Sequence, residues 1–199
     1  MMTSYIDEYV DFLYIMINLD YVDYEIKIGV LHSIMKAGTD PYSTIQLPKE
    51  ALINAIEKKR RLAIEVLNIA KTTQSMEYLE AALGVLQFMS QCCRKISAYL
   101  INQGGIAKII KGILNKNMKY AGIKESCILL IRSLLAAEEN TREVTEHLFE
   151  EIISIIREVV TNHQNSKNIG LFRLILQLSR VLVKDDQFFD HIRSEGIFS

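Results

Sequence analysis

The sequence predicts an all-α protein in which about four helical repeats stack into a right-handed superhelix, an α-solenoid. One observation is a pattern that recurs about every 47 residues, beginning near Arg94, near Thr141 and again at Gln187; helical periods of about 40–47 residues are typical of such stacks. A second is that only two prolines and nine glycines interrupt 199 residues, fewer than a strand-rich chain needs for its turns. A third is that apolar residues recur three and four positions apart along most segments, as in amphipathic helices.

Two helices are predicted in the first unit, residues 5–38. The first, over residues 5–18, is indicated by apolar residues at helical spacing: Tyr5, Ile6, Tyr9, Phe12, Leu13 and Met16. The second runs from Tyr24 to Ala37 and ends at Gly38, because glycine is the common residue just past a helix end. Residues 39–47, which include an Asp-Pro pair, predict a loop.

The next two units, residues 48–92 and 93–138, are each predicted to contain a short helix followed by two longer ones. Pro48 fits the first turn of the first short helix, where its missing N–H removes no hydrogen bond. The predicted helices of these units are 48–56, 59–71 and 76–91, and then 96–102, 106–115 and 120–136.

A fourth unit, residues 140–184, is predicted to repeat this order with helices 144–148, 149–160 and 169–183. Residues 187–199 then look like the start of a further repeat or like a cap. A stack of repeats needs polar outer faces at its ends. The chain is therefore either a piece of a longer array or a small protein whose terminal helices serve as caps.

The stretch from Arg94 to Glu138 shows the most distinctive order of elements. A short apolar helix ends in Gly104-Gly105-Ile106, an isoleucine-rich helix follows, and a third helix runs from Ile123 to Leu134. This plan resembles the armadillo repeat, whose short first helix ends in a similar glycine-containing turn. The resemblance extends over residues 48–199 and partly over 5–38, and the two-helix HEAT repeat is its near neighbour.

The armadillo resemblance implies that the third helices line a concave groove in which partners lie as extended peptides. Family members that bind nuclear-localisation peptides use a Trp and an Asn one turn apart on each third helix, for packing and for hydrogen bonds. This chain has no Trp, and the corresponding positions hold Gly84 and Phe88, Leu129 and Ser133, and Leu176 and Arg180. Nuclear-import cargo is therefore not a predicted partner.

The groove-facing positions that remain predict a non-catalytic adaptor or scaffold that binds a peptide or helix of another protein. These residues are Glu77, Glu80, Gln87, Gln91, Arg132, Ser133, Arg173, Gln177 and Arg180. Their charge changes from acidic to basic along the chain, which would suit a partner of opposite gradient. The alternative is that they are only the solvated faces of separate helices.

Large apolar residues also gather at the end of the chain: Phe188, Phe189, Ile197 and Phe198. Such residues predict either capping contacts or an interface through which copies of the chain associate.

A different class of function is suggested by the bases between residues 94 and 124, where no acid occurs: Arg94, Lys95, Lys108, Lys111, Lys116, Lys119 and Lys124. This stretch could bind phosphates of nucleic acid or lipid. Nucleic acid is disfavoured because the net charge is −1 and only Tyr99 and Tyr120 are available for stacking. The run Lys58-Lys59-Arg60-Arg61 has the composition of a nuclear-localisation signal, but its place at a predicted helix junction favours a structural role.

Signatures of catalysis and of metal binding are missing from the sequence. It contains no P-loop, GxGxxG, GxSxG or HExxH motif, and its four histidines lack ligand spacing, so neither an enzyme nor a cofactor or metal is predicted. Three cysteines without a disulfide pattern, a polar N-terminus and no apolar run of about 20 residues predict a soluble cytoplasmic protein, with a nuclear location left open.

Overall fold

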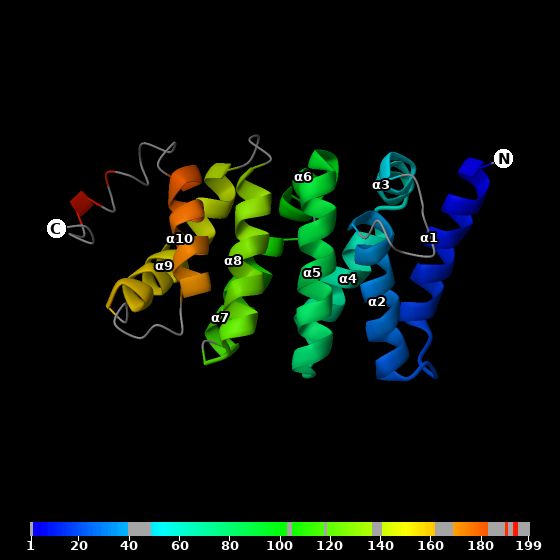
Figure 1. Cartoon of the computed structure of the whole chain (residues 1–199), viewed down its shortest axis with the longest axis horizontal. Helices are drawn as coiled ribbons and strands as arrows, with labels where there is room; N and C mark the ends of the chain where they lie inside the picture. Colours follow the sequence, from blue (N-terminus) through cyan, green and yellow to red (C-terminus); the bar gives the residue numbers. More distant parts are fainter. Residues whose placement is uncertain are drawn as a thin grey trace.

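The computed structural model describes residues 2–39, 49–102, 105–117, 119–136, 141–161, 169–182, 190 and 193–194. Within these ranges the regular structure is entirely helical (Figure 1). The helices are α1 (Met2–Asn18), α2 (Tyr24–Thr39), α3 (Lys49–Lys58), α4 (Arg61–Thr72), α5 (Met76–Cys92), α6 (Arg94–Asn102), α7 (Ile106–Asn117), α8 (Ala121–Leu135), α9 (Thr141–Thr161) and α10 (Ile169–Leu182). The all-α prediction is therefore confirmed for the described residues.

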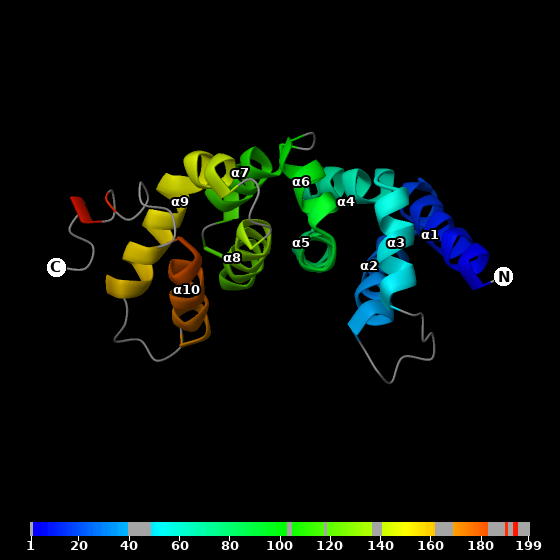
Figure 2. The same ribbon diagram turned by 90° about the horizontal axis from the view of Figure 1, so that it is seen from above.

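The longer helices form two rows. Helices α2, α5, α8 and α10 lie side by side in chain order, and each packs against the next (Figure 1). We call these four helices the inner row. Helices α1, α4, α7 and α9 also pack in chain order and form the outer row. Figure 2 shows that the two rows curve into an arch with the inner row on its concave side.

The helices of the second and third units begin at residue numbers that differ by a constant offset. Helices α3, α4 and α5 begin at residues 49, 61 and 76, and α6, α7 and α8 begin at 94, 106 and 121, which is 45 residues later in each case. The offset is slightly shorter than the period of about 47 residues that the sequence pattern predicts.

The fourth unit departs from the prediction, which placed separate helices at 144–148 and 149–160. The structure instead has one continuous helix of 21 residues, α9. In the preceding unit the chain breaks between α6 and α7, where Gly105 adopts a φ of 60° that favours glycine. No glycine or proline lies between Thr141 and Thr161, so nothing in α9 interrupts its hydrogen bonding.

The hydrophobic core lies between the two rows and runs through the length of the described chain. Fully buried side chains come from both rows, including Leu31 of α2, Leu62 of α4, Leu86 of α5 and Ile110 of α7. Burial of one such side chain stabilises a fold by roughly 1.5–3 kcal/mol. Helix α5 lies near the middle of the core and packs against α2, α3, α4, α6 and α8.

Candidate functional site

The concave face of α5 carries a stripe of polar and small residues. The tight packing of α5 buries ten of its 17 residues. A regular series at intervals of three and four positions stays exposed or half-buried, and therefore shares one helix face: Glu77, Glu80, Gly84, Gln87 and Gln91. All four α5 residues predicted to face the groove belong to this stripe.

Helix α8 places its predicted residues differently. Arg132 is half-buried on the accessible face, whereas Ser133 is only 4% exposed. The Ser133 hydroxyl donates a hydrogen bond to the carbonyl oxygen of Leu129 at 2.8 Å. The prediction that Ser133 is accessible in the groove is therefore wrong, because this side chain is buried and bonded to its own helix.

The accessible stripe of α8 consists instead of Gly122, Glu125, Leu129 and Arg132. The prediction missed Glu125, although counting back from Arg132 in steps of three and four would have found it. Leu129 was aligned with a family position but was not assigned to the groove.

Helices α8 and α10 meet through two predicted residues. The Arg132 guanidinium donates a hydrogen bond from Nη1 to Oε1 of Gln177, which is half-buried on α10. Arg173 and Arg180 are exposed, and Leu176 beside them is 50% exposed. Arg132 and Gln177 therefore connect the accessible faces of α8 and α10.

Helix α2 extends this surface on the other side of α5. A pocket of about 280 Å³ lies between the two helices and is lined by Ile28, His32, Met35, Glu77, Glu80 and Ala81. The sequence analysis assigned no α2 residue to the site. We call the combined stripes of α2, α5, α8 and α10 the inner-row surface.

Glycines allow the inner-row helices to approach each other. A Cβ atom placed on Gly84 would lie 2.8 Å from Sδ of Met35, and one placed on Gly122 would collide with the carboxylate of Glu80. The side chain of one helix therefore rests on a glycine of the next, at both the α2–α5 and the α5–α8 contact. This contact keeps the stripes in adjacent positions.

The charges on the inner-row surface differ between α5 and α10. Glu77 and Glu80 lie on α5, and Arg173 and Arg180 lie on α10. Within the described residues none of these four side chains forms an ion pair. They are therefore available to groups of opposite charge on a partner.

The predicted terminal interface lies outside the described residues. Phe188, Phe189, Ile197 and Phe198 all belong to segments that the structure does not describe. Association of copies through this end stays a prediction.

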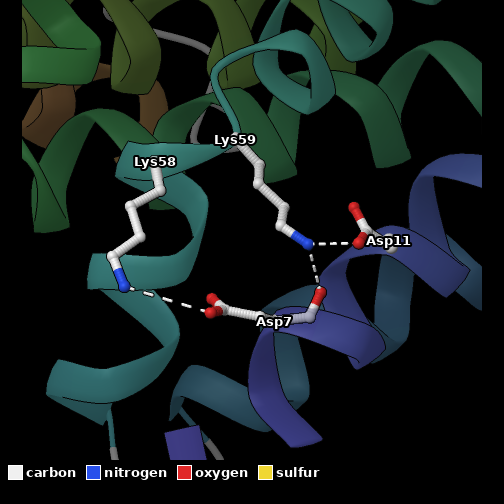
Figure 3. Close-up of polar contacts among 4 residues, drawn as sticks. All are labelled: Asp7, Asp11, Lys58 and Lys59. Atoms are coloured by element: carbon white, nitrogen blue, oxygen red, sulfur yellow. Dashed lines mark hydrogen bonds and ion pairs between the residues drawn. The ribbon is translucent and has the colours of Figure 1, made fainter. Parts of the chain in front are cut away.

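The basic run at residues 58–61 joins the start of the chain to the helices that follow. Nζ of Lys58 lies 3.9 Å from Oδ2 of Asp7, and Lys59 donates to the carbonyl oxygen of Asp7 at 2.6 Å and pairs with Asp11 (Figure 3). The two arginines of the run stack on aromatic rings: Arg60 lies 5.4 Å from the centre of the Tyr99 ring and Arg61 lies 5.7 Å from that of Tyr14. These contacts support the structural role that the sequence favours for the run.

The bases of residues 94–124 are divided among several environments. Lys95 donates to Oε1 of Glu57 at 2.5 Å, and this hydrogen bond lowers the pKa of Glu57 and raises the pKa of Lys95. Lys111 pairs with Glu151 at 3.1 Å. Lys124 is only 5% exposed. The stretch is therefore not one continuous basic surface.

The described residues offer little for redox or metal chemistry. Burial raises the pKa of the Cys127 thiol to about 12 and also raises that of Cys93, so both are protonated at neutral pH. Within the described ranges, no three His, Cys, Asp or Glu side chains come together as a metal-ion site requires. Among the described helices, none combines the length and the apolar composition needed to cross a membrane.

Comparison of the chain with protein-family models, with curated proteins and with solved structures found no match.

Proposed function

We propose that this chain is a non-catalytic protein-interaction module that binds a peptide or helical segment of another protein on the inner-row surface. The observation that carries the proposal is the accessible stripe that continues from α2 to α10 on the concave side of the arch. Its acids on α5 and its arginines on α10 form no ion pair with one another or with the other described residues. The proposal includes the architecture: an α-solenoid of armadillo-like repeats. The constant offset of 45 residues between α3–α5 and α6–α8 supports such repeats, and the pair α9 and α10 resembles a two-helix HEAT unit.

The size of the surface sets the length of the partner segment. Neighbouring packed helices lie about 8–10 Å apart, so the three steps from α2 to α10 span roughly 25–30 Å. An extended peptide advances about 3.3 Å per residue. Eight or nine residues crossing the row would therefore contact all four helices.

The charges set the direction of that segment. Basic side chains of the partner would lie over Glu77 and Glu80, and acidic side chains over Arg173 and Arg180. A guanidinium can form two parallel hydrogen bonds with one carboxylate, so the α10 arginines would fix the acidic end. The apolar part of the pocket at Ile28 and Met35 would receive an aliphatic stem or apolar side chain.

The experiment is a selection of binding peptides from a random display library on the full chain. The peptides that carry a basic end and an acidic end, as the charges of α5 and α10 require, are then measured for affinity on the Arg173→Glu/Arg180→Glu variant. The selected peptides are expected to bind this variant at least tenfold more weakly. Its helical circular dichroism and melting temperature should be unchanged, because both side chains are exposed.

The matched control is Arg94→Glu/Lys119→Glu, which reverses two exposed charges outside the inner-row surface and should leave affinity unchanged. Equal affinity of the selected peptides for the wild-type chain and for the α10 variant would refute the proposal.

A further inference from the structure

A second groove of about 750 Å³ lies along α7, where consecutive units meet. One face of α7 forms one side of it, through residues spaced three or four positions apart: Gly105, Lys108, Ile109, Gly112, Ile113 and Lys116. The other side is formed by the end of α4, the connection to α5 and the first turn of α5. We call this the α7 groove. It shares no residue with the inner-row surface, and the inference below stands apart from the proposed function.

The α7 groove combines an apolar floor with basic edges. The floor includes Met76, Leu79, Ile109 and Ile113. Three exposed lysines stand at its edges, Lys71 from α4 and Lys108 and Lys116 from α7, and none of the described residues that line it is acidic.

The three lysines at the edges of the groove differ from Lys111 of α7, because Lys111 has an ion-pair partner. Lys111 lies between Lys108 and Lys116 in sequence and pairs with Glu151 at 3.1 Å. Within the described residues, Lys71, Lys108 and Lys116 form no ion pair. Three ammonium groups therefore surround an apolar groove without a carboxylate to neutralise them.

Gly112 keeps the middle of the groove open. It lies in the interior of α7, where glycine is the least favourable residue after proline. No heavy atom lies within 4 Å of a Cβ placed on it. A larger side chain at this position would enter the groove and not the core.

We propose that the α7 groove binds an acidic segment of another protein, in which an apolar side chain lies between two carboxylates. Lys108 and Lys116 are eight residues apart on one helix, about 12 Å along its axis, a distance that an extended segment covers in about four residues. The apolar side chain would lie on Ile109 and Ile113, and Gln74 is available to the backbone of the segment.

The lining favours a peptide over a nucleic acid. Bases bind single-strand grooves by stacking on aromatic rings, and the described residues that line the α7 groove include no aromatic side chain. A bound nucleic acid would also place its polar sugar–phosphate backbone against the apolar floor, which is a poor match. An acidic peptide satisfies both the lysines and the floor.

The test is a selection from a random peptide display library on the full chain, with counter-selection on the Gly112→Leu variant. This variant fills the groove, keeps every charge and replaces a poor helix former by a good one. The recovered peptides are expected to carry two acidic residues about four positions apart with an apolar residue between them. They should bind Lys108→Glu/Lys116→Glu at least tenfold more weakly and the control Lys36→Glu/Lys119→Glu as tightly as the wild-type chain.

Three results would overturn the inference. The counter-selection could leave no peptide, the recovered peptides could lack acidic residues, or they could bind Lys108→Glu/Lys116→Glu with unchanged affinity. A peptide is also rejected as the occupant if an oligothymidylate or phosphatidylserine vesicles bind more strongly than the best peptide and lose this binding in Lys108→Glu/Lys116→Glu. Unchanged binding of the same peptides to Arg173→Glu/Arg180→Glu is expected and separates this groove from the inner-row surface.

Discussion

Replacing Gly105 and Gly112 by alanine, one at a time, is expected to change the stability of the fold in opposite directions. Gly105 directly precedes α7 and Gly112 lies inside it, and neither has a heavy atom near the position of a new Cβ. Only Gly105 has a positive φ, 60°. The same chemical change is therefore made in two open positions that differ in backbone conformation.

The magnitudes follow from that difference. An alanine in the left-handed conformation costs about 1–2 kcal/mol, and the lower entropy of the unfolded chain returns about 0.4–1 kcal/mol. The net expectation for Gly105→Ala is a loss of about 1 kcal/mol. In the interior of α7, Gly112→Ala should raise stability by about 0.8–1 kcal/mol, the difference in helix propensity.

The two variants should differ by about 2 kcal/mol in the free energy of unfolding in urea, and by about 4–8 °C in melting temperature for a chain of this size. Full stability of Gly105→Ala would show that this glycine does not hold the turn between α6 and α7. Gly105 would then not be the reason why α6 and α7 are separate helices, and the lack of a glycine would not explain why α9 is continuous.

Three further predictions concern individual side chains. Ser133→Glu should unfold or strongly destabilise the chain, because it places an unpaired charge at a buried position. Arg132→Glu, at the adjacent accessible position, should fold, and circular dichroism with melting curves compares the stability of the two variants. The pKa of Glu57 is lowered by Lys95, so the contribution of this pair to stability is present above the ordinary pKa of 4.5 and is lost as the pH falls through the lowered value. In urea titrations, Lys95→Met should therefore lose less stability than the wild-type chain as the pH falls below 4.5, and an equal loss in both chains would contradict the assignment. Cys127 is buried and its pKa is raised to about 12, so it should resist thiol reagents at about pH 8 in the native state and react in denaturant. Mass spectrometry of the modified peptides measures this, and rapid modification of Cys127 in the native chain would contradict its burial.

The sequence predicts the helices well where apolar spacing and glycines act together. In residues 93–138 the spacing marks the buried faces and Gly105 marks the break, and the structure has helices close to the predicted limits. In residues 140–160 the same order of elements was expected by analogy with the preceding unit, although no residue there interrupts a helix. The prediction fails at α9 because residues 141–161 contain no glycine or proline that could end a short helix, as Gly105 does after α6.

The candidate surfaces are predicted less completely, because their geometry depends on contacts between distant segments. The acids of α5 follow from helical spacing, but the contribution of His32 and Met35 depends on how α2 packs against α5. Ser133 is misplaced because one position along a helix separates an accessible face from the core. Lys71 joins Lys108 and Lys116 only through the packing of α4 against α7, so the basic stretch in the sequence indicates a charge cluster without revealing the groove.

The inner-row proposal is tested most directly by mapping where a selected peptide contacts the chain. A photo-reactive amino acid placed at Gln87 on α5, at Arg173 on α10, or at the exposed Ser154 on α9 of the outer row would form covalent links to whatever lies beside it. Peptides recovered with the wild-type chain, and still bound by the Gly112→Leu variant, should be linked from positions 87 and 173 and not from 154. Linking from position 154 alone would contradict binding on the concave side.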